Sequence, residues 1–307
     1  MARFLCETSN VASPETEVEL QLRRLIFDRL ADIVADKGVV TRAELEAFDV
    51  GGARRRLIDQ SKGIWNPRYL QATLSVLSNP RGPYEDSHIG ESLYAYDYCA
   101  GSVDGTNRKL RRAYELGLPI IMLRTISAGV FVPVFPVYVV HDDRDNRKFI
   151  LALDESLRFV SDPLHLRPDE REYAQRITRQ RLHQPEFRGR VLQAYDTRCS
   201  VCSLRHGKLL DAAHIIGDAK PHGRPIVENG LSLCKIHHAA FDAHLLGVDA
   251  DYVVHINRDL MNEVDGPMLR HGLQEMDGRK LGLPSKKAER PSQERLRERF
   301  AEFLNAG

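Results

Sequence analysis

CSVCSLRHGKLLDAAHIIGDAKPHGRPIVENGLSLCKIHHAAFD, residues 199–242, is the stretch that decides the fold of the second half of the chain. It opens with Cys199-x-x-Cys202 and carries Cys234-x-x-His237 near its end, so a pair of soft ligands stands at each end of the segment. Two such pairs, each closed by a tight turn, supply the four ligands of a tetrahedral zinc ion. The spacing therefore predicts structural Zn²⁺ bound by Cys199, Cys202, Cys234 and His237.

Between the two pairs lies a short apolar segment that contains a histidine. Residues 209–216 have the length and composition of a strand, and we interpret His214 as a general base, because a neutral imidazole can take a proton from water near neutral pH. Side chains alternate along a strand. Asp211 is therefore expected on the face opposite His214, as a ligand of a divalent cation past which the strand twists.

The end of the stretch predicts a helix that starts at Cys234. His238 and Asp242 are four residues apart, on one helix face, and are predicted to complete the cation site with Asp211. Adjacent side chains diverge by about 100° on a helix, so His237 can serve the zinc while His238 serves the catalytic cation. Asn229 either bridges a loop or orients His214 by accepting its other ring proton. Taken alone, the Cys/His pattern also fits a zinc ribbon with a purely structural role.

Three motifs together resemble the HNH family of ββα-metal nucleases: Cys199-x-x-Cys202, Asp211-Ala-Ala-His214-Ile, and Asn229-Gly-Leu-x-Leu-Cys234-x-x-His237-His238-x-x-x-Asp242. The resemblance implies that His214 is the general base and Asn229 ties the loop. It also implies that His238 and Asp242 bind a single Mg²⁺ or a related ion such as Mn²⁺. Many members carry His or Asp directly before the base, where this chain has Ala213, so the remaining ligand role is assigned to Asp211.

Composition limits the class of protein. The chain has 307 residues, 42% of them hydrophobic and 28% charged, which is enough for two folded domains. No apolar run approaches the ~20 residues of a membrane helix, and the start lacks the long apolar region of a signal peptide, so we expect a cytoplasmic protein without a membrane partner. Three of the five cysteines fall in the proposed zinc site, leaving Cys6 and Cys99 and arguing against a disulfide scaffold.

The net charge is small, but its distribution is uneven. A formal charge of +1 implies no partner, whereas residues 171–208 carry eight arginines and one lysine against three acidic residues, a local net charge of +6. Such a stretch either follows the phosphates of a nucleic acid or forms a solvated helix face.

Hydrophobic periodicity divides the first half of the chain. Residues 1–62 are predicted as a helical lead-in, with a helix over 15–35 entered at Ser13-Pro14 and a capping box between Thr41 and Glu44. Residues 63–160 are predicted as a mixed, strongly bent sheet. Its expected elements are strands at 71–77, 93–98, 119–124, 130–140 and 149–153 and a helix over 107–116 that ends at Gly117, and Pro133 and Pro136 predict a bend or an edge.

The remaining boundaries follow from proline and from the motif. Residues 161–190 are predicted as a linker helix, interrupted near Pro185, and residues 191–307 as the nuclease domain, with a terminal helix over 293–304. The expected fold class is therefore α+β.

The order of elements in the first half loosely resembles the PUA-like β-barrels, the group that includes SRA and EVE domains. The match lies in Asn107-x-x-Leu110-x-x-Ala113-x-x-x-Gly117-x-Pro119-Ile120-Ile121 followed by Val130-Phe131-x-Pro133-Val134-x-Pro136-Val137-Tyr138-Val139. Such barrels are fused to HNH modules in McrA-type modification-dependent restriction endonucleases. The resemblance implies a reader of modified DNA, for example of methylated or hydroxymethylated cytosine.

A set of aromatic and basic residues is the candidate DNA surface. Aromatic rings would stack on a base taken out of the duplex, and arginines would hold phosphates. Tyr94, Tyr96 and Tyr98 alternate and share one strand face, which also fits simple core packing. The predicted DNA-binding residues are Trp65, Arg68, Tyr94, Tyr96, Tyr98, Arg179 and Arg181.

The sequence thus predicts a metal-dependent DNA endonuclease that leaves a 3′-hydroxyl and a 5′-phosphate, as the family implies, and that a reader domain directs. A homodimer is a reasonable expectation, because double-strand cleavage by one site per chain calls for two chains or two visits. Two alternatives stay open: a catalytically silent zinc protein that binds nucleic acid or regulates, and an HNH nuclease that does not depend on modification.

Overall fold

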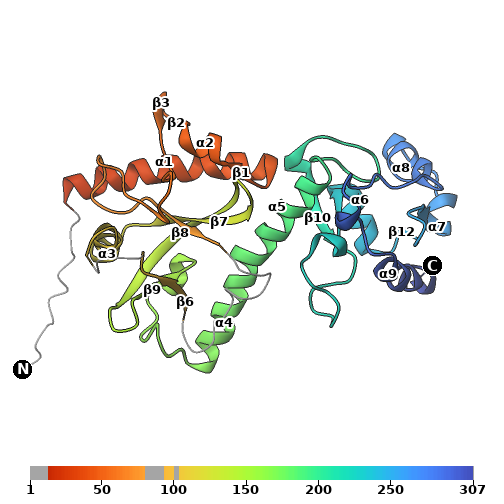
Figure 1. Ribbon diagram of the computed structural model, residues 1–307. Helices are drawn as coiled ribbons and strands as arrows, with labels where there is room; N and C mark the ends of the chain where they lie inside the picture. The colour runs from red at the N-terminus through yellow and green to blue at the C-terminus, as the bar shows by residue number, and fades with distance from the viewer. Residues whose placement is uncertain (1–12, 80–92, 100–103, 307) are drawn as a thin grey trace, which may run out of the picture.

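The computed structural model describes residues 13–79, 93–99 and 104–306 and shows two lobes (Figure 1). The sheet lobe, residues 13–160, is built on a bent β-sheet. The Cys/His lobe, residues 195–306, is built on hairpins and short helices. A helical connector, residues 168–194, runs from one lobe into the other (Figure 1). The predicted α+β class is confirmed.

Local capping signals define the helices of the sheet lobe as predicted. The Ser13 side chain accepts a hydrogen bond from the backbone of Thr16, and Thr41 forms a capping box with Glu44. Gly117, in the left-handed region with φ 61°, ends α3. The elements of this lobe are α1 (Pro14–Lys37), β1 (Val40–Thr41), α2 (Arg42–Glu46), β2 (Phe48–Val50), β3 (Ala53–Arg55), β4 (Ile64–Trp65), β5 (Ser75–Ser78), β6 (Tyr94–Asp97), α3 (Asn107–Leu116), β7 (Ile120–Ser127), β8 (Val130–Asp143) and β9 (Lys148–Ala152).

The main sheet of the described residues runs in the order β4-β5-β7-β8-β9-β6, and β1 pairs with the start of β8. Strands β5 and β7 are parallel, and the other neighbours on this path are antiparallel. Pro133 lies opposite Leu123, and at Phe135-Pro136 two residues of β8 face a single residue of β7. Because an extra residue of this kind bends a strand, the predicted bend lies within a central strand.

The sheet separates two cores, because alternate residues of β7 face opposite sides. Ile120 and Met122 pack in a cluster with α3, whereas Ile121 and Leu123 pack in a cluster with α1. The sheet curls until Tyr96 of β6 donates a hydrogen bond to the carbonyl of Gly63, just before β4, over 3.2 Å. Within the described ranges no ladder joins β4 to β6, so the sheet is a half-barrel and the predicted PUA-like barrel is not confirmed.

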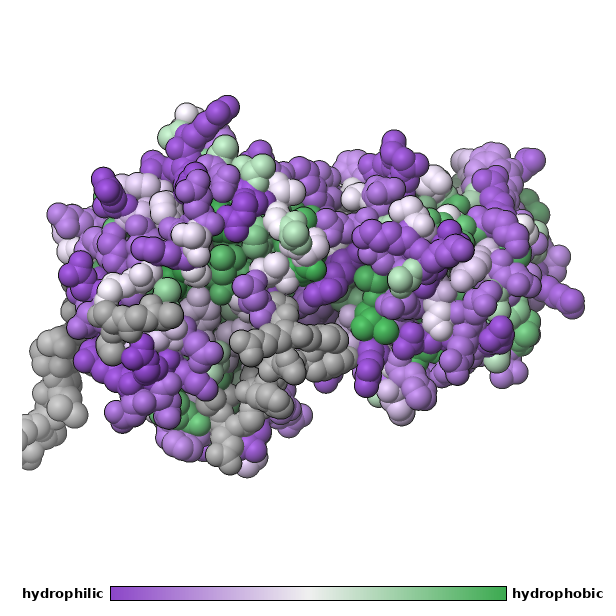
Figure 2. Space-filling model, in the orientation of Figure 1, coloured by the Kyte–Doolittle hydropathy of each residue, from purple (hydrophilic) through white to green (hydrophobic). Residues whose placement is uncertain are grey.

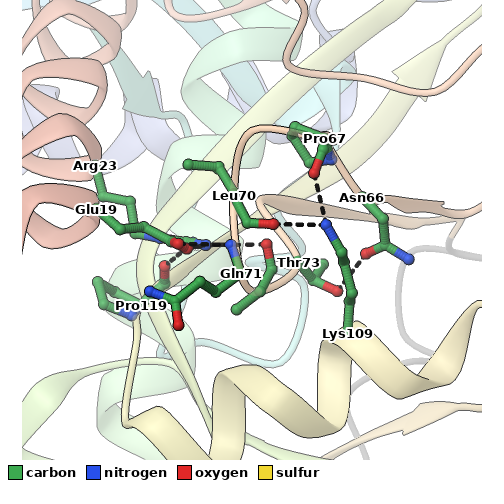
Figure 3. Close-up of polar contacts among 10 residues, drawn as sticks. Glu19, Arg23, Asn66, Pro67, Leu70, Gln71, Thr73, Lys109 and Pro119 are labelled. Atoms are coloured by element: carbon green, nitrogen blue, oxygen red, sulfur yellow. Dashed lines mark hydrogen bonds and ion pairs between the residues drawn. The ribbon is translucent and has the colours of Figure 1, made fainter. Parts of the chain in front are cut away.

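A buried ion pair ties α1 to the sheet lobe (Figure 3). Arg23, with 0% of its surface exposed, contacts Glu19 at 2.6 Å and donates to the carbonyl of Pro119 at 2.6 Å. The second carboxylate oxygen of Glu19 accepts from the backbone of Gln71 at 2.7 Å. Lys109 of α3 supports the same loop by donating to backbone carbonyls (Figure 3). Buried charges with all their partners in place fix the position of α1 on the sheet.

The connector is one helical rod with a π-helical turn in its middle. It consists of α4 (Pro168–Thr178), the turn Arg179–His183 and α5 (Gln184–Ala194). The backbone of Gln184 bonds to the carbonyl of Arg179, five residues earlier. Pro185 has no N–H to give to an α-helical bond, so the predicted interruption takes the form of a wider turn.

The two ends of the connector belong to different cores. Ala174, Ile177 and Leu182 pack in a cluster of the sheet lobe, whereas Phe187 and Val191 pack in the core of the Cys/His lobe. The connector therefore buries apolar surface in both lobes.

Polar contacts fix the two lobes against each other through α5. Glu186 forms a buried ion pair with Arg124 of β7 at 2.7 Å. Arg188 donates to the carbonyls of Val34 and Ala35 in α1 and to that of Leu210 in the Cys/His lobe. The same helix thus contacts both lobes, and it is positioned by both.

The Cys/His lobe starts from a hairpin and ends in a docked helix. The terminal helix agrees with its prediction, and Phe303 closes it onto Gly247. None of the helices described has the length and apolarity needed to cross a membrane. The elements are β10 (Leu210–His214), β11 (Gly230–Cys234), α6 (Lys235–Asp242), β12 (Leu246–Val248), β13 (Val254–Ile256), α7 (Arg258–Asn262), α8 (Pro267–Gly272) and α9 (Gln293–Ala306).

Candidate active site and metal centre

The four predicted zinc ligands converge on one point. Cys199 and Cys202 follow α5, Cys234 ends β11, and His237 lies in the first turn of α6. One ligand atom from each lies within 4.8 Å of the others, and Nδ1 of His237 is 3.4 Å from Sγ of Cys199 and 3.1 Å from Sγ of Cys234. Nε2 of the same ring donates to the carbonyl of Gly272 at 2.7 Å, which leaves Nδ1 for a metal. The donor set fits a metal such as zinc.

His238 lies between two carboxylates. Its Nδ1 is 3.5 Å from Oδ2 of Asp211, and its Nε2 is 3.4 Å from Oδ2 of Asp242. The hydrogen bond to Asp211 raises the pKa of His238, and the charge of Asp242 adds to this effect. The structure brings the three predicted cation ligands together. The two carboxylates contact opposite ring nitrogens of His238, and their binding of one ion stays a prediction.

The negative charge of Asp211 is balanced by basic side chains of the protein. It forms an ion pair with Lys235, and its Oδ1 is 3.8 Å from Nε of Arg188. The hydrogen bond from His238, with that from Lys235, holds the pKa of the Asp211 carboxyl well below its usual range. Asp211 is therefore an ionised carboxylate with protein partners, and its role as a cation ligand stays a prediction.

His214 ends β10 opposite Gly230 and lies against α5. Its ring stacks on Phe187, with the centroids 4.0 Å apart and the planes at 19°. In the part of the chain that the structure describes, the buried Nε2 of His214 has no hydrogen-bond partner. Burial lowers the pKa of His214, while the nearby carboxylates of Asp218 and Asp242 partly oppose the change. The imidazole is therefore neutral near pH 7, the form in which it can accept a proton.

Asn229 bridges the loop between the two strands of the hairpin. Its side chain is fully buried, accepts a hydrogen bond from the backbone of Ile216 at 2.9 Å and donates to the carbonyls of Ile216 and Arg224. Of the two roles considered for Asn229, bridging the loop is the one that these hydrogen bonds show. Because its amide is committed to backbone groups, it acts on His214 through the hairpin rather than through the imidazole ring.

The predicted aromatic surface lies inside the sheet lobe. Tyr94 is 5% exposed, with its hydroxyl 2.9 Å from that of Ser78, and Tyr98 stacks on Phe149 with the ring centroids 4.6 Å apart. Tyr96 packs beside them. The three rings therefore occupy the positions expected from the core-packing alternative.

Trp65 and the three predicted arginines divide between packing and surface. The indole of Trp65 donates to the carbonyl of Arg56 at 2.8 Å and packs on the core that includes α1. Arg181 donates to backbone carbonyls of β8 and of Leu153, and it is 3.4 Å from Asp154. These contacts tie the connector to the sheet, and the contact of Arg181 with DNA stays a prediction. Arg68 and Arg179 are exposed.

Two residues of the site were not found from the sequence. Phe187 stacks on the ring of His214, and Lys235 forms an ion pair with the carboxylate of Asp211. Gly230 is a sequence signal for the position of Phe187, because a Cβ at residue 230 would lie 2.5 Å from Val191 and 2.9 Å from Phe187. A glycine beside the motif asparagine therefore indicates close approach of another backbone element, but it does not identify that element.

Comparisons with known proteins agree with this geometry in the Cys/His lobe. Residues 199–249 match the family model described as HNH endonuclease, so this segment is similar to the HNH endonucleases. No curated protein matches the chain.

Two solved structures are similar to the chain at low identity. One is described as "Modification dependent TagI restriction endonuclease", with 17% identity, 85% of this chain and 90% of that chain covered, and a TM-score of 0.30. Another is described as "Structure of the Type IV phosphorothioation-dependent restriction endonuclease ScoMcrA", with 16% identity, 58% and 52% covered, and a TM-score of 0.21.

Proposed function

We propose that this protein is a metal-dependent endonuclease that hydrolyses phosphodiester bonds of DNA. The observation that carries the proposal is His214, a neutral imidazole that ends the first strand of the hairpin and lines a hollow, in a segment that matches the HNH endonuclease model. A general base needs a proton-accepting nitrogen that no other group of the protein occupies. His214 meets that requirement.

In this proposal His214 accepts a proton from the attacking water, whose oxygen forms a bond to phosphorus. The bond from phosphorus to the 3′-oxygen breaks, which leaves a 3′-hydroxyl and a 5′-phosphate. His238 and Asp242 would hold Mg²⁺ or Mn²⁺, with Asp211 as the third candidate. A divalent cation at this place would polarise the phosphate and stabilise the leaving oxygen. Asn229 keeps the hairpin loop closed, and Phe187 keeps the ring of His214 in position.

The Cys/His cluster has a structural role in the proposal. Zn²⁺ bound by its four ligands would join the segment after α5 to the start of α6, which carries both His237 and His238. The zinc would therefore fix the distance between the hairpin and the helix, and it would contribute free energy of folding rather than chemistry.

The sheet lobe is proposed as the part that selects the target. An HNH module is small, so a second domain of ordinary size is the natural source of specificity. We assign residues 1–62 to a helical lead-in, 63–160 to a PUA-like reader of modified DNA, 161–190 to the linker and 191–307 to the nuclease. A homodimer would place two active sites on one duplex.

Plasmid nicking tests the enzyme assignment. Wild-type protein loaded with zinc should nick plasmid DNA when Mg²⁺ or Mn²⁺ is added, and His214→Ala should lose about 100-fold or more of that rate, as expected for loss of a general base. His206→Ala, a change of an exposed histidine, is the matched control and should nick normally. Zinc-replete wild-type protein that binds but does not nick any DNA tried would leave the silent binding protein as the function.

Matched substrates test the dependence on modification. The same DNA is prepared without modification, with 5-methylcytosine, with 5-hydroxymethylcytosine and with N6-methyladenine. The proposal expects one of the modified forms to be cut faster than the unmodified form. Equal cutting of all four would identify an HNH nuclease that does not depend on these modifications.

A further inference from the structure

A hollow beside His214 separates the connector from loop 217–225. Its connector wall carries Gln175, Arg179 and His183, and its loop wall carries Lys220 and Arg224. The hollow has a volume of about 540 Å³, within the range of pockets that hold small ligands. Because His214 lines it too, a group bound there would lie beside the proposed general base.

A second hollow continues the first toward the sheet lobe. It has a volume of about 560 Å³, reaches Asn79 and Thr125, and shares His183, Phe187 and Pro225 with the first. The two hollows therefore lie side by side along the connector, and we refer to them together as the channel. Figure 2 shows hydrophilic side chains where the two lobes meet, next to a hydrophobic patch on the Cys/His lobe. The channel therefore leads from the edge of the sheet lobe to His214.

The π-helical turn of the connector determines which side chains face the channel. Leu182 is fully buried in the core of the sheet lobe, and Arg181 donates a hydrogen bond to the carbonyl of Leu153 in the same lobe. Arg179 and His183, four residues apart, lie on the other side and line the channel. Turns of this type are rare and occur frequently at functional sites.

The end of the channel near His214 carries more positive than negative side chains. Arg179, Lys220 and Arg224 line it together with one acidic residue, Asp218. Lys220 is positioned by an ion pair with Glu302 of α9. Several cations in a concave surface attract phosphate groups and raise their local concentration.

We propose that this channel binds the sugar–phosphate backbone of one DNA strand, which runs from the sheet lobe along the connector, with Arg179 on a phosphate next to the one presented to His214. The proposal rests on the nuclease function above and places its substrate strand. It makes the connector a part of the DNA-binding surface, in addition to its role as a link between lobes.

Binding of a short duplex oligonucleotide to two charge-matched variants tests the channel. Both variants are made in the His214→Ala protein, which binds without cutting, and affinity is measured as a function of salt concentration. Arg179→Ala should weaken binding roughly tenfold, because it removes a charged hydrogen bond. It should also reduce the slope of log K against log salt by about 0.9, the contribution of one phosphate contact.

The matched control is Arg176→Ala. Arg176 is exposed on the same helix three residues earlier, its guanidinium lies 4.9 Å from the ring of Tyr173, and it does not line the channel. This variant should keep the affinity and the salt slope of the parent, and Arg179→Lys should recover most of the slope. Unchanged thermal melting and zinc content would show that both proteins are folded.

The outcomes separate this proposal from the function on which it rests. If wild-type protein nicks DNA but Arg179→Ala and Arg176→Ala bind alike, the channel is wrong and the nuclease stands. If Arg179→Ala alone loses affinity and salt slope while wild-type protein never nicks, the channel stands as a DNA-binding site without turnover.

Discussion

The metal centre and the candidate cation site share one helix, yet they differ in how completely the fold assembles them. The four ligand atoms of the metal centre lie within 4.8 Å of one another. In the candidate cation site, Asp211 and Asp242 contact opposite nitrogens of His238. Adjacent histidines of α6 thus belong to a cluster whose ligand atoms converge and to one whose carboxylates lie on opposite sides of a ring. The difference indicates that the fold alone brings the four metal-centre ligands together, whereas Asp211 and Asp242 would have to move to share one ion on His238.

The largest effect should come from breaking the complete site. Cys202→Ser removes a thiolate ligand, and structural zinc contributes on the order of 10 kcal/mol to the folding of small zinc domains. We expect the Cys/His lobe to lose its metal and unfold, as measured by zinc content and thermal melting. Cys99→Ser, a change in the sheet lobe, should leave both unchanged. Normal melting with normal zinc in Cys202→Ser would show that the cluster is not a structural metal site.

A comparison of the two adjacent histidines should separate folding from chemistry. His237→Ala should lose metal and stability, whereas His238→Ala should keep both and lose about 100-fold or more of the nicking rate, because a ligand of the catalytic cation is gone. The measurements are zinc content, melting temperature and nicking rate on the same preparations. A His238→Ala protein that nicks at the rate of wild type would remove His238 from the cation site.

A smaller effect is expected from removing the ring of Phe187, which stacks on His214. Burial keeps the pKa of His214 low, so Phe187→Ala should let it rise toward its usual value. Because the base must be deprotonated to act, the acid limb of the pH–rate profile should move to higher pH. An unchanged acid limb in a folded Phe187→Ala protein would contradict this role of the stack.

The smallest effect should follow from removing Lys235, whose ammonium group forms an ion pair with Asp211. The side chain of Lys235 is 56% exposed, so Lys235→Ala should change the free energy of unfolding by less than about 1 kcal/mol. If Asp211 binds the catalytic ion, half-maximal nicking should require less Mg²⁺ in this variant, because a competing positive charge is absent. An unchanged Mg²⁺ requirement would assign Asp211 to the positioning of His238 alone.

What could be predicted from the sequence depended on local signals. The entry of α1 at Ser13, the capping box of Thr41 and the end of α3 at Gly117 are set by side chains within a few residues of the backbone groups they satisfy. The convergence of the metal ligands was predictable for a similar reason, since Cys-x-x-Cys and Cys-x-x-His each fix a short turn.

Contacts between distant segments were not predictable in this way. Arg181 was predicted to contact DNA, and its hydrogen bonds to the carbonyls of Phe135 and Leu153, which lie far from it in the sequence, were not foreseen. The stack of Phe187 on His214 likewise joins the connector to the hairpin, and hydrophobic spacing alone marks Phe187 only as a core residue. The predicted ligand geometry of Asp211 was incomplete because Lys235 and Arg188 also reach its carboxylate.

The division of the connector between two cores has a consequence for how such chains can be recombined. A cut before residue 191 would remove Phe187 and Arg188, which belong to the core and the hydrogen bonds of the Cys/His lobe. A Cys/His lobe transferred to another sheet lobe would therefore have to take α5 with it, and the new host would need a surface that accepts the outward side of that helix. Recombination in this architecture is thus limited by the fit of a single helix.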